Sequence, residues 1–192
     1  MRRARGSYIV PLYALWIRSG QPCITPAEWS RLARTLSIGL TLLLTACLEA
    51  TPQLGRGDFM PAFTLPRLGG GTFTVPSDVD GDVLALRFWA DWCHYCESDM
   101  AGMETVFRKY RQEGLRVLAI NVGQPRETAR QFVDRLGLTY DILLDPNGTV
   151  SRSYGVVALP ATFLVDRQGR LVTRILGESK AEVLERVVLE LL

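Results

Sequence analysis

Two cysteines separated by two residues, Cys93 and Cys96, are the side chains of this sequence whose type and spacing point most directly to chemistry. They lie in the segment WADWCHYCESD, residues 89–99. Three roles compete for such a pair: thiol-disulfide redox chemistry, half of a zinc site, or a small structural disulfide.

The zinc and structural roles fit the chain poorly. A structural zinc ion needs four ligands, which usually come as two spaced pairs. His94 is the only histidine, and the two remaining cysteines, Cys23 and Cys47, lie far toward the N-terminus. A disulfide that closes so short a loop contributes only about 2 kcal/mol by the loop-entropy estimate, the least favourable place for a cross-link. Redox chemistry is therefore the favoured role.

The placement of the pair suits redox chemistry. The cysteines follow a continuous apolar segment, residues 82–88, which indicates a buried strand. They open a helical pattern that runs to Gly114, with one apolar face formed by Cys96, Met100, Met103, Phe107 and Tyr110. A helix start lowers a thiol pKa from about 8.5 toward about 3.5–7.5. We therefore expect Cys93 to be the attacking sulfur and Cys96, one turn later, to be the resolving sulfur.

The remaining pattern predicts one α/β domain. A glycine cluster at 69–71 predicts a hairpin turn into the strand TFTV at 72–75. Ser179 and Glu182 are expected to form the capping box of an amphipathic C-terminal helix. The other expected elements are strands at 115–122, 140–145, 161–166 and 170–176, and a helix over 125–137 that completes a βαβ unit.

With these elements the sequence resembles thioredoxin-like proteins of the TlpA/ResA type over roughly residues 57–192. The resemblance rests on PAFTL near Pro61, FWADWCHYC, the inserted βαβ unit, YGVVALPATFLVD and the C-terminal helix. It implies an α/β thioredoxin-like fold, with a central mixed β-sheet flanked by helices and an inserted βαβ unit. It also implies no cofactor or metal beyond the redox-active Cys93–Cys96 disulfide, and a cis peptide at Leu159–Pro160 facing that pair. An ordinary trans proline at a strand edge is the alternative at that position.

Two positions beneath the cysteines depart from the family pattern. Arg87 stands where thioredoxins place a buried acid, and Asp99 stands where the family often has Glu. The two side chains could meet, with Asp99 accepting the proton of Cys96; alternatively, Arg87 bends to the surface and Asp99 only favours the helix start. His94 is either a cation that favours the thiolate or an exposed neutral side chain. We expect Trp92, adjacent to the pair, to modulate the redox couple together with Arg87 and His94.

Another cysteine lies in a targeting motif. Arg31 and Arg34 precede the apolar run 36–46, which has the length of a signal-peptide core and is too short to span a membrane. The run ends in LTAC at Cys47 and resembles the lipobox of bacterial lipoproteins. That resemblance implies that Cys47 carries lipid and becomes the mature N-terminus. A plain secretory signal and a buried core helix are the alternatives.

The expected organisation is a leader over 1–46, a linker over 47–57 and a thioredoxin-like domain over 58–192. About 30 residues precede Arg31, an unusual extension for a signal peptide, so we expect the true translation start to lie downstream. Residues 1–57 carry seven Arg against two Glu, whereas the expected domain carries 15 basic and 18 acidic residues. The basic excess therefore belongs to the N-terminal part, and we expect no nucleic-acid partner.

These inferences favour a thiol-disulfide oxidoreductase of the bacterial cell envelope, outside the cytoplasm and anchored by lipid on Cys47. The family resemblance implies a reductase that draws electrons from a membrane thiol donor and reduces secreted proteins such as apocytochrome c. An oxidant or isomerase of disulfide formation is the first alternative. A thiol peroxidase would need a TxxC motif, which has no counterpart in this sequence. A copper-delivery protein of this fold, the alternative that is not an enzyme, would need CxxxC and a distant histidine or methionines, whereas the spacing here is CxxC and His94 is the only histidine.

Overall fold

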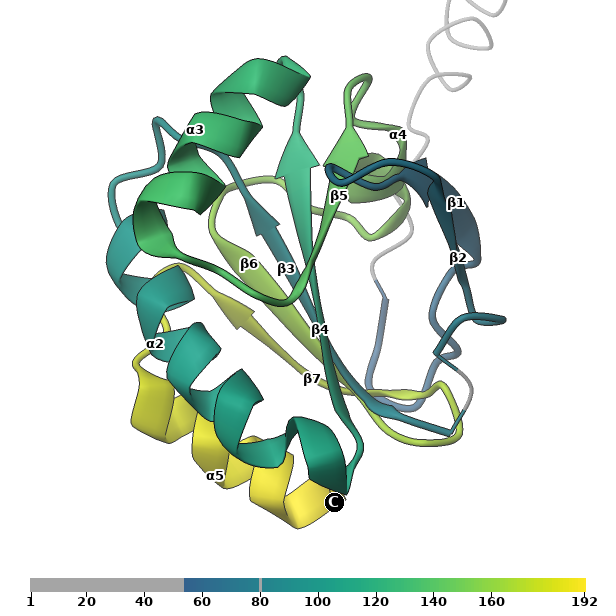
Figure 1. Cartoon of the computed structure of the whole chain (residues 1–192). Coiled ribbons are helices and arrows are strands. Elements are labelled where there is room, and N and C mark those ends of the chain that lie inside the picture. The colour runs from purple at the N-terminus through teal and green to yellow at the C-terminus, as the bar shows by residue number, and fades with distance from the viewer. Residues whose placement is uncertain (1–53, 80) are drawn as a thin grey trace, which may run out of the picture. The chain divides into compact units, whose positions relative to one another are not determined.

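The computed structural model describes residues 54–79 and 81–192 (Figure 1). The predicted signal peptide over 1–46, with Cys23, lies outside the described residues. Cys47 and most of the predicted linker over 47–57 lie outside them as well. Among the residues that are described, no helix is long and apolar enough to cross a membrane.

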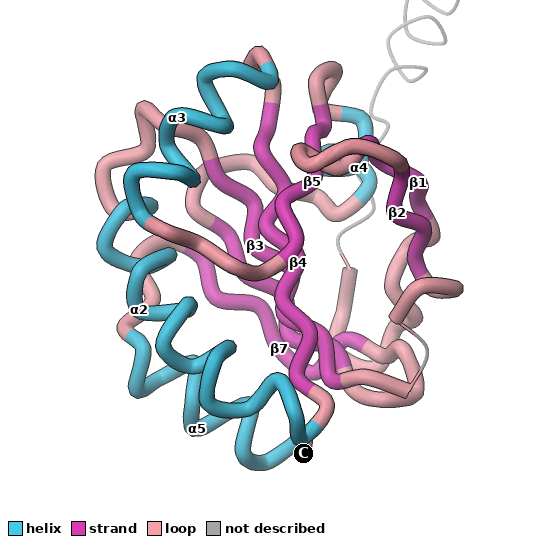
Figure 2. Tube along the Cα trace, viewed as in Figure 1, coloured by secondary structure: helices cyan, strands magenta, loops and turns pink. Residues whose placement is uncertain are grey.

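The chain alternates between strands and helices, as the sequence predicts. In chain order the elements are β1 (Phe63–Pro66), β2 (Thr72–Val75), β3 (Val83–Trp89), α2 (Cys96–Tyr110), the 3-10 turn η2 (Arg111–Glu113), β4 (Leu115–Val122), α3 (Arg126–Leu136), β5 (Asp141–Asp145), α4 (Thr149–Ser153), β6 (Ala161–Val165), β7 (Leu171–Leu176) and α5 (Ala181–Leu191). The central sheet has the order β5-β4-β3-β6-β7 (Figure 2). It is mixed, because β3, β4 and β5 run parallel whereas β6 is antiparallel to both of its neighbours.

Both faces of the central sheet are covered. Helices α2, α3 and α5 lie over one face, and the β1–β2 hairpin and α4 lie over the other (Figure 1). Met100 of α2 and Leu184 of α5 belong to the buried cluster on the helical side. Phe73 of the hairpin and Tyr154, just after α4, belong to a second cluster on the other side. The Tyr154 hydroxyl also donates a hydrogen bond to the carbonyl of Pro61 at 2.9 Å, which ties the segment before β1 to the domain.

Strand β3 is buried along its whole length because both faces of the sheet are covered. Its residues Ala85 and Trp89 pack on the helical side. Leu86 and Phe88 pack on the side of the hairpin. This double burial explains why the sequence shows a continuous apolar run here instead of alternation. By the same alternation, Arg87, the one charged residue of the strand, lies on the helical side.

The structure contains the hairpin and the βαβ unit that the turn-forming residues predicted. β1 and β2 pair antiparallel across a turn in which Gly70 and Gly71 have φ of 108° and 74°, a region that glycine adopts at low cost. The inserted βαβ unit consists of β4, α3 and β5. Its helix has Pro125 at the N-cap position and ends at Gly137 in the left-handed conformation.

The start of α5 differs from the prediction. The helix begins at Ala181 after the N-cap residue Lys180, and no side chain caps it. Ser179 lies one residue too early, where its backbone N–H donates a hydrogen bond to the Asp99 carboxylate of α2 at 2.8 Å. The prediction that Ser179 and Glu182 form a capping box is therefore wrong, because a tertiary contact with α2 sets the position of Ser179.

A short helix, α4, follows β5 where the sequence predicted only a turn. Asp145, the last residue of β5, is 1% exposed. Its carboxylate accepts hydrogen bonds from the backbone N–H groups of Val150 and Ser151, at 3.3 and 2.9 Å. The chain therefore forms the short helix α4 after the turn, because the buried Asp145 carboxylate satisfies free N–H groups at the start of that helix.

Glu104 ties α2 to the segment before β5. Its carboxylate accepts hydrogen bonds from Arg108 Nε at 2.5 Å, from the Thr139 backbone N–H at 2.9 Å and from Thr139 Oγ1 at 2.6 Å. Burial by itself raises the pKa of this carboxyl group, but the hydrogen bonds from Thr139 and Arg108 outweigh burial and lower the pKa of Glu104 below its ordinary value. The ionised form is therefore the one that the fold stabilises.

We expect Glu104→Gln to lower the free energy of unfolding at pH 7 by about 1–2 kcal/mol, because it weakens charge-assisted hydrogen bonds. The carboxyl pKa is lower in the folded than in the unfolded protein, so its contribution is present above about pH 4.3 and is lost as pH falls through the folded pKa. Urea unfolding at pH 7 and pH 3 should therefore show a difference between parent and variant that shrinks at low pH. Glu97→Gln, exposed on the same helix, is the control and should change stability little. A difference that is independent of pH would contradict the assignment.

Candidate active site

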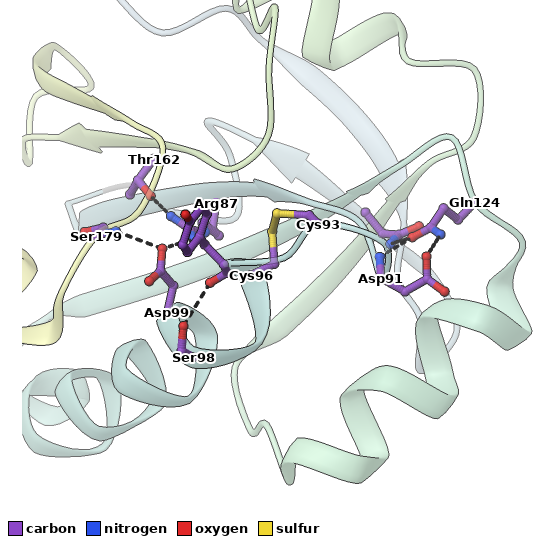
Figure 3. The surroundings of a disulfide bond; sticks show 11 residues. Arg87, Asp91, Cys93, Cys96, Ser98, Asp99, Gln124, Thr162 and Ser179 are labelled. Atoms are coloured by element: carbon purple, nitrogen blue, oxygen red, sulfur yellow. Dashed lines mark hydrogen bonds and ion pairs between the residues drawn. A yellow bond between two sulfur atoms is a disulfide. The ribbon is translucent and has the colours of Figure 1, made fainter.

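Cys93 and Cys96 form a disulfide at the start of α2, with their Cα atoms 5.4 Å apart (Figure 3). Cys96 is the first residue of the helix, and its backbone N–H donates to the Cys93 carbonyl at 3.0 Å. The two residues differ in accessibility, since Cys93 is 6% exposed and Cys96 is fully buried. An incoming thiol or disulfide can therefore reach Cys93 more readily than Cys96.

The residues beside and between the cysteines lie at the surface. Trp92 is 70% exposed and Tyr95 is 48% exposed. His94 is also exposed, and its ring packs edge-on against Tyr95 with the ring centroids 5.0 Å apart. Trp92, His94 and Tyr95, which are close to Cys93 in the sequence, present exposed ring surface that a protein partner can contact.

Pro160 lies beside the end of β3 from which the cysteines emerge. The Leu159–Pro160 peptide is cis, as the family resemblance implies. Pro160 is buried and directly precedes β6, whose residue Ala161 pairs with Phe88 near the end of β3. The Pro160 carbonyl accepts a hydrogen bond from the Gly177 N–H at 2.8 Å, so the segment is anchored to the end of β7.

Arg87 and Asp99 meet on one side of the disulfide (Figure 3). Arg87 is fully buried, and its Nη2 lies 2.5 Å from Asp99 Oδ2. Its Nη1 donates to Thr162 Oγ1 at 2.7 Å. The same oxygen of Asp99 accepts the backbone N–H of Ser179. The structure therefore brings Arg87 and Asp99 together and excludes the alternative in which Arg87 reaches the surface.

Burial acts directly on the guanidinium of Arg87. It lowers the pKa of Arg87 below its ordinary value, whereas the hydrogen bond and negative charge of Asp99 oppose that decrease. A guanidinium remains charged in proteins, so this position holds a cation inside the domain. An uncompensated buried charge is costly, and Asp99 is the carboxylate that compensates it. Any proton transfer between Asp99 and Cys96 must therefore take place within this ion pair.

A second network near the cysteines was not identified from the sequence. The Gln124 side chain, in the loop between β4 and α3, bonds to the backbone N–H and the carboxylate of Asp91, and to Asn121. Only the predicted order of strands could have indicated this network. In a parallel βαβ unit the end of β4 lies next to the end of β3, where the cysteines begin.

Within residues 54–79 and 81–192, no group of three or more His, Cys, Asp or Glu side chains is placed to hold a metal ion.

The chain is similar to a known protein family and to several known relatives. The AhpC/TSA family matches residues 56–174, more than half of the sequence. The chain belongs to this AhpC/TSA family. Thiol-disulfide oxidoreductase ResA of Geobacillus kaustophilus is 35% identical over 150 residues, covering 78% of this chain and 85% of the relative. ResA of Geobacillus thermodenitrificans is 34% identical over 146 residues, covering 76% and 83%.

A solved structure also resembles this member of the AhpC/TSA family. A crystal structure from Chlorobium tepidum, assigned as thiol:disulfide interchange protein DsbE, superposes with a TM-score of 0.68 at 33% identity. It covers 72% of this chain and 98% of the Chlorobium chain. The predicted thioredoxin-like fold and the predicted class, a thiol-disulfide oxidoreductase, are therefore confirmed. Relatives of this class act on thiols or disulfides.

We expect Asp99→Asn to destabilise the domain by about 3–5 kcal/mol, because it leaves the buried Arg87 guanidinium without a counter-charge. Replacing both residues, as Arg87→Leu with Asp99→Asn, removes that charge and should recover most of the stability. If Asp99 accepts the proton of Cys96, both variants should resolve a mixed disulfide on Cys93 about 10²–10⁴-fold more slowly at pH 7, and recover as pH approaches the pKa of Cys96.

Urea unfolding measures the change in stability, and stopped-flow kinetics measures the rate at which the mixed disulfide on Cys93 is resolved. The double variant is the decisive sample, because it separates proton transfer from stability. If the double variant resolves the mixed disulfide at the parent's rate, Asp99 serves only as the counter-charge of Arg87 and does not accept the proton of Cys96.

Proposed function

We propose that this protein is an extracytoplasmic reductase of protein disulfides. The observation that carries the proposal is the CxxC pair at a helix start, in which Cys93 is 6% exposed and Cys96 is fully buried. This arrangement suits a two-step exchange in which the accessible cysteine engages a partner and the buried cysteine releases it. The similarity to ResA and DsbE proteins supports the same chemistry.

The exchange begins with the Cys93 thiolate. It attacks one sulfur of a substrate disulfide, forms a mixed disulfide and displaces the other substrate sulfur as a thiolate. Cys96, deprotonated in turn, attacks the Cys93 sulfur and displaces the remaining substrate thiolate. The substrate disulfide has then gained two electrons, and the protein holds the Cys93–Cys96 disulfide described above. The Asp99 carboxylate, one helical turn beyond Cys96, is the group proposed to take the proton of Cys96.

Turnover requires a thiol donor that reduces the Cys93–Cys96 disulfide again. We assign this role to a membrane thiol reductase, because the signal-peptide layout and Cys47 imply attachment to a bacterial membrane outside the cytoplasm. Secreted proteins with cysteine pairs, such as apocytochrome c, are the proposed substrates. The exposed rings of Trp92 and Tyr95 offer a surface for an unfolded protein segment that carries the disulfide.

Trapping in cells tests this function. Cys96→Ser should accumulate mixed disulfides with secreted proteins, because Cys93 can attack but no resolving sulfur follows. Cys93→Ser should accumulate few, since Cys96 is buried. Non-reducing gels with mass spectrometry identify the conjugates, and alkylation in intact cells reports the redox state of the parent pair.

A reductase supplied with electrons should keep the parent pair mainly as dithiol. A pair found mainly as disulfide would indicate an oxidant instead. Equal trapping through both cysteines would reverse the order of attack.

We further expect Cys47 to be the lipid-modified N-terminus of the mature protein. Mass spectrometry of the membrane fraction should find a lipidated peptide that begins at Cys47. Cys47→Ala should shift the protein out of that fraction without affecting the in vitro exchange rate of the domain. An unmodified peptide that reads through from Ala46 to Leu48 in the mature protein would contradict the assignment.

A further inference from the structure

The side-chain amide of Gln124 lies beside the active-site loop and takes no part in the exchange chemistry itself. Figure 3 shows it with Asp91 on the opposite side of the disulfide from Arg87 and Asp99. Gln124 belongs to the inserted βαβ unit, in the loop that joins β4 to α3. It therefore brings a contact from the insertion to the loop that carries Cys93.

Every group of the Gln124 amide is engaged. Its Oε1 accepts hydrogen bonds from the backbone N–H of Asp91 at 2.9 Å and from Asn121 Nδ2 at 2.8 Å. Its Nε2 donates to the carboxylate oxygen Oδ1 of Asp91. Because two donors surround the amide oxygen, the NH₂ group must face the carboxylate, and the orientation of the amide is unambiguous.

The base of this network is a buried residue of the central sheet. Asn121 is 1% exposed and lies in β4, where it pairs in register with Trp89, the last residue of β3. The loop from β3 to α2 is also held by burial, since Ala90 is fully buried and Cys93 is 6% exposed. Within it, the Cys93 N–H donates to the Ala90 carbonyl at 3.2 Å. Gln124 thus connects a buried strand to Asp91, two residues before the attacking sulfur.

We propose that Gln124 is a positioning residue for thiol-disulfide exchange: through Asp91 it holds the loop that carries Cys93 in the geometry from which the sulfur attacks. The inference rests on the proposed function, since it concerns the nucleophile of that reaction. It gives the inserted βαβ unit a part in the chemistry, namely the support of the active-site loop. A role in stability alone is the competing outcome.

An isosteric substitution separates these roles. Gln124→Glu retains both accepted hydrogen bonds but sets a second carboxylate against that of Asp91, so the donated bond becomes a repulsion. Combining it with Asp91→Asn places an amide opposite the new carboxylate, which restores a donor and acceptor pair and the parent's net charge. We expect the single variant to attack about ten-fold more slowly at pH 7 and the double variant to recover.

The rate is measured for the first attack alone. In a reduced Cys96→Ser background, the Cys93 thiolate reacts with hydroxyethyl disulfide, forms a mixed disulfide with one hydroxyethylthio group and releases one mercaptoethanol thiolate. Mass spectrometry follows the reaction with time. The reagent is uncharged, so a slower rate does not arise from repulsion between reagent and protein.

The pH profile gives a readout that a purely structural role would not change. Two facing carboxyl groups cannot both ionise readily, so one takes up a proton as pH falls and can then donate to the other. The rate of Gln124→Glu relative to the parent should therefore rise toward one between pH 8 and pH 5. Gln131→Glu is the matched control, because it sets a carboxylate against Glu127 on α3, away from the active-site loop. It should react at the parent's rate.

The outcomes are distinguishable. A parent that fails to react would refute the proposed function, whatever Gln124 does. A reactive parent with an equally reactive Gln124→Glu variant would overturn the positioning role. Equal slowing in the single and double variants would overturn it as well, because restoring the pair at positions 91 and 124 would then have no effect on Cys93.

Discussion

The buried ion pair between Arg87 and Asp99 is the interaction around which the candidate active site is built. A guanidinium at the centre of the sheet must find a counter-charge and hydrogen-bond acceptors within the domain, because water does not reach it. Asp99 supplies the charge from α2, and Thr162 supplies an acceptor from β6. The backbone N–H of Ser179 bonds to the same carboxylate from the segment before α5. One charge on β3 thus sets the relative positions of three neighbouring elements.

The two cysteines are held from opposite sides. On one side, the ion pair anchors the first turn of α2 and with it Cys96, which is buried. On the other side, Gln124 reaches from the inserted unit to the loop that precedes Cys93. Thiol-disulfide exchange needs this division, because the attacking sulfur must meet a partner while the resolving sulfur waits within one helical turn.

Family membership establishes the fold and the class of reaction but not the contacts of individual side chains. The AhpC/TSA match and the similarity to ResA and DsbE proteins establish the fold and the class of reaction. The ion pair of Arg87 with Asp99 and the hydrogen bonds of Gln124 to Asp91 are details that the structure of this chain adds.

The sequence by itself determined the elements and the reactive pair. Periodicity of apolar residues records burial, so the doubly covered strand β3, the apolar face of α2 and the inserted βαβ unit were all predictable. Only the tertiary structure decided between the two environments considered for Arg87, and only it placed Gln124 against Asp91. It also moved Ser179 out of its predicted cap. These contacts join residues from 12 to 80 positions apart, and local sequence patterns carry no information about which distant polar groups will meet.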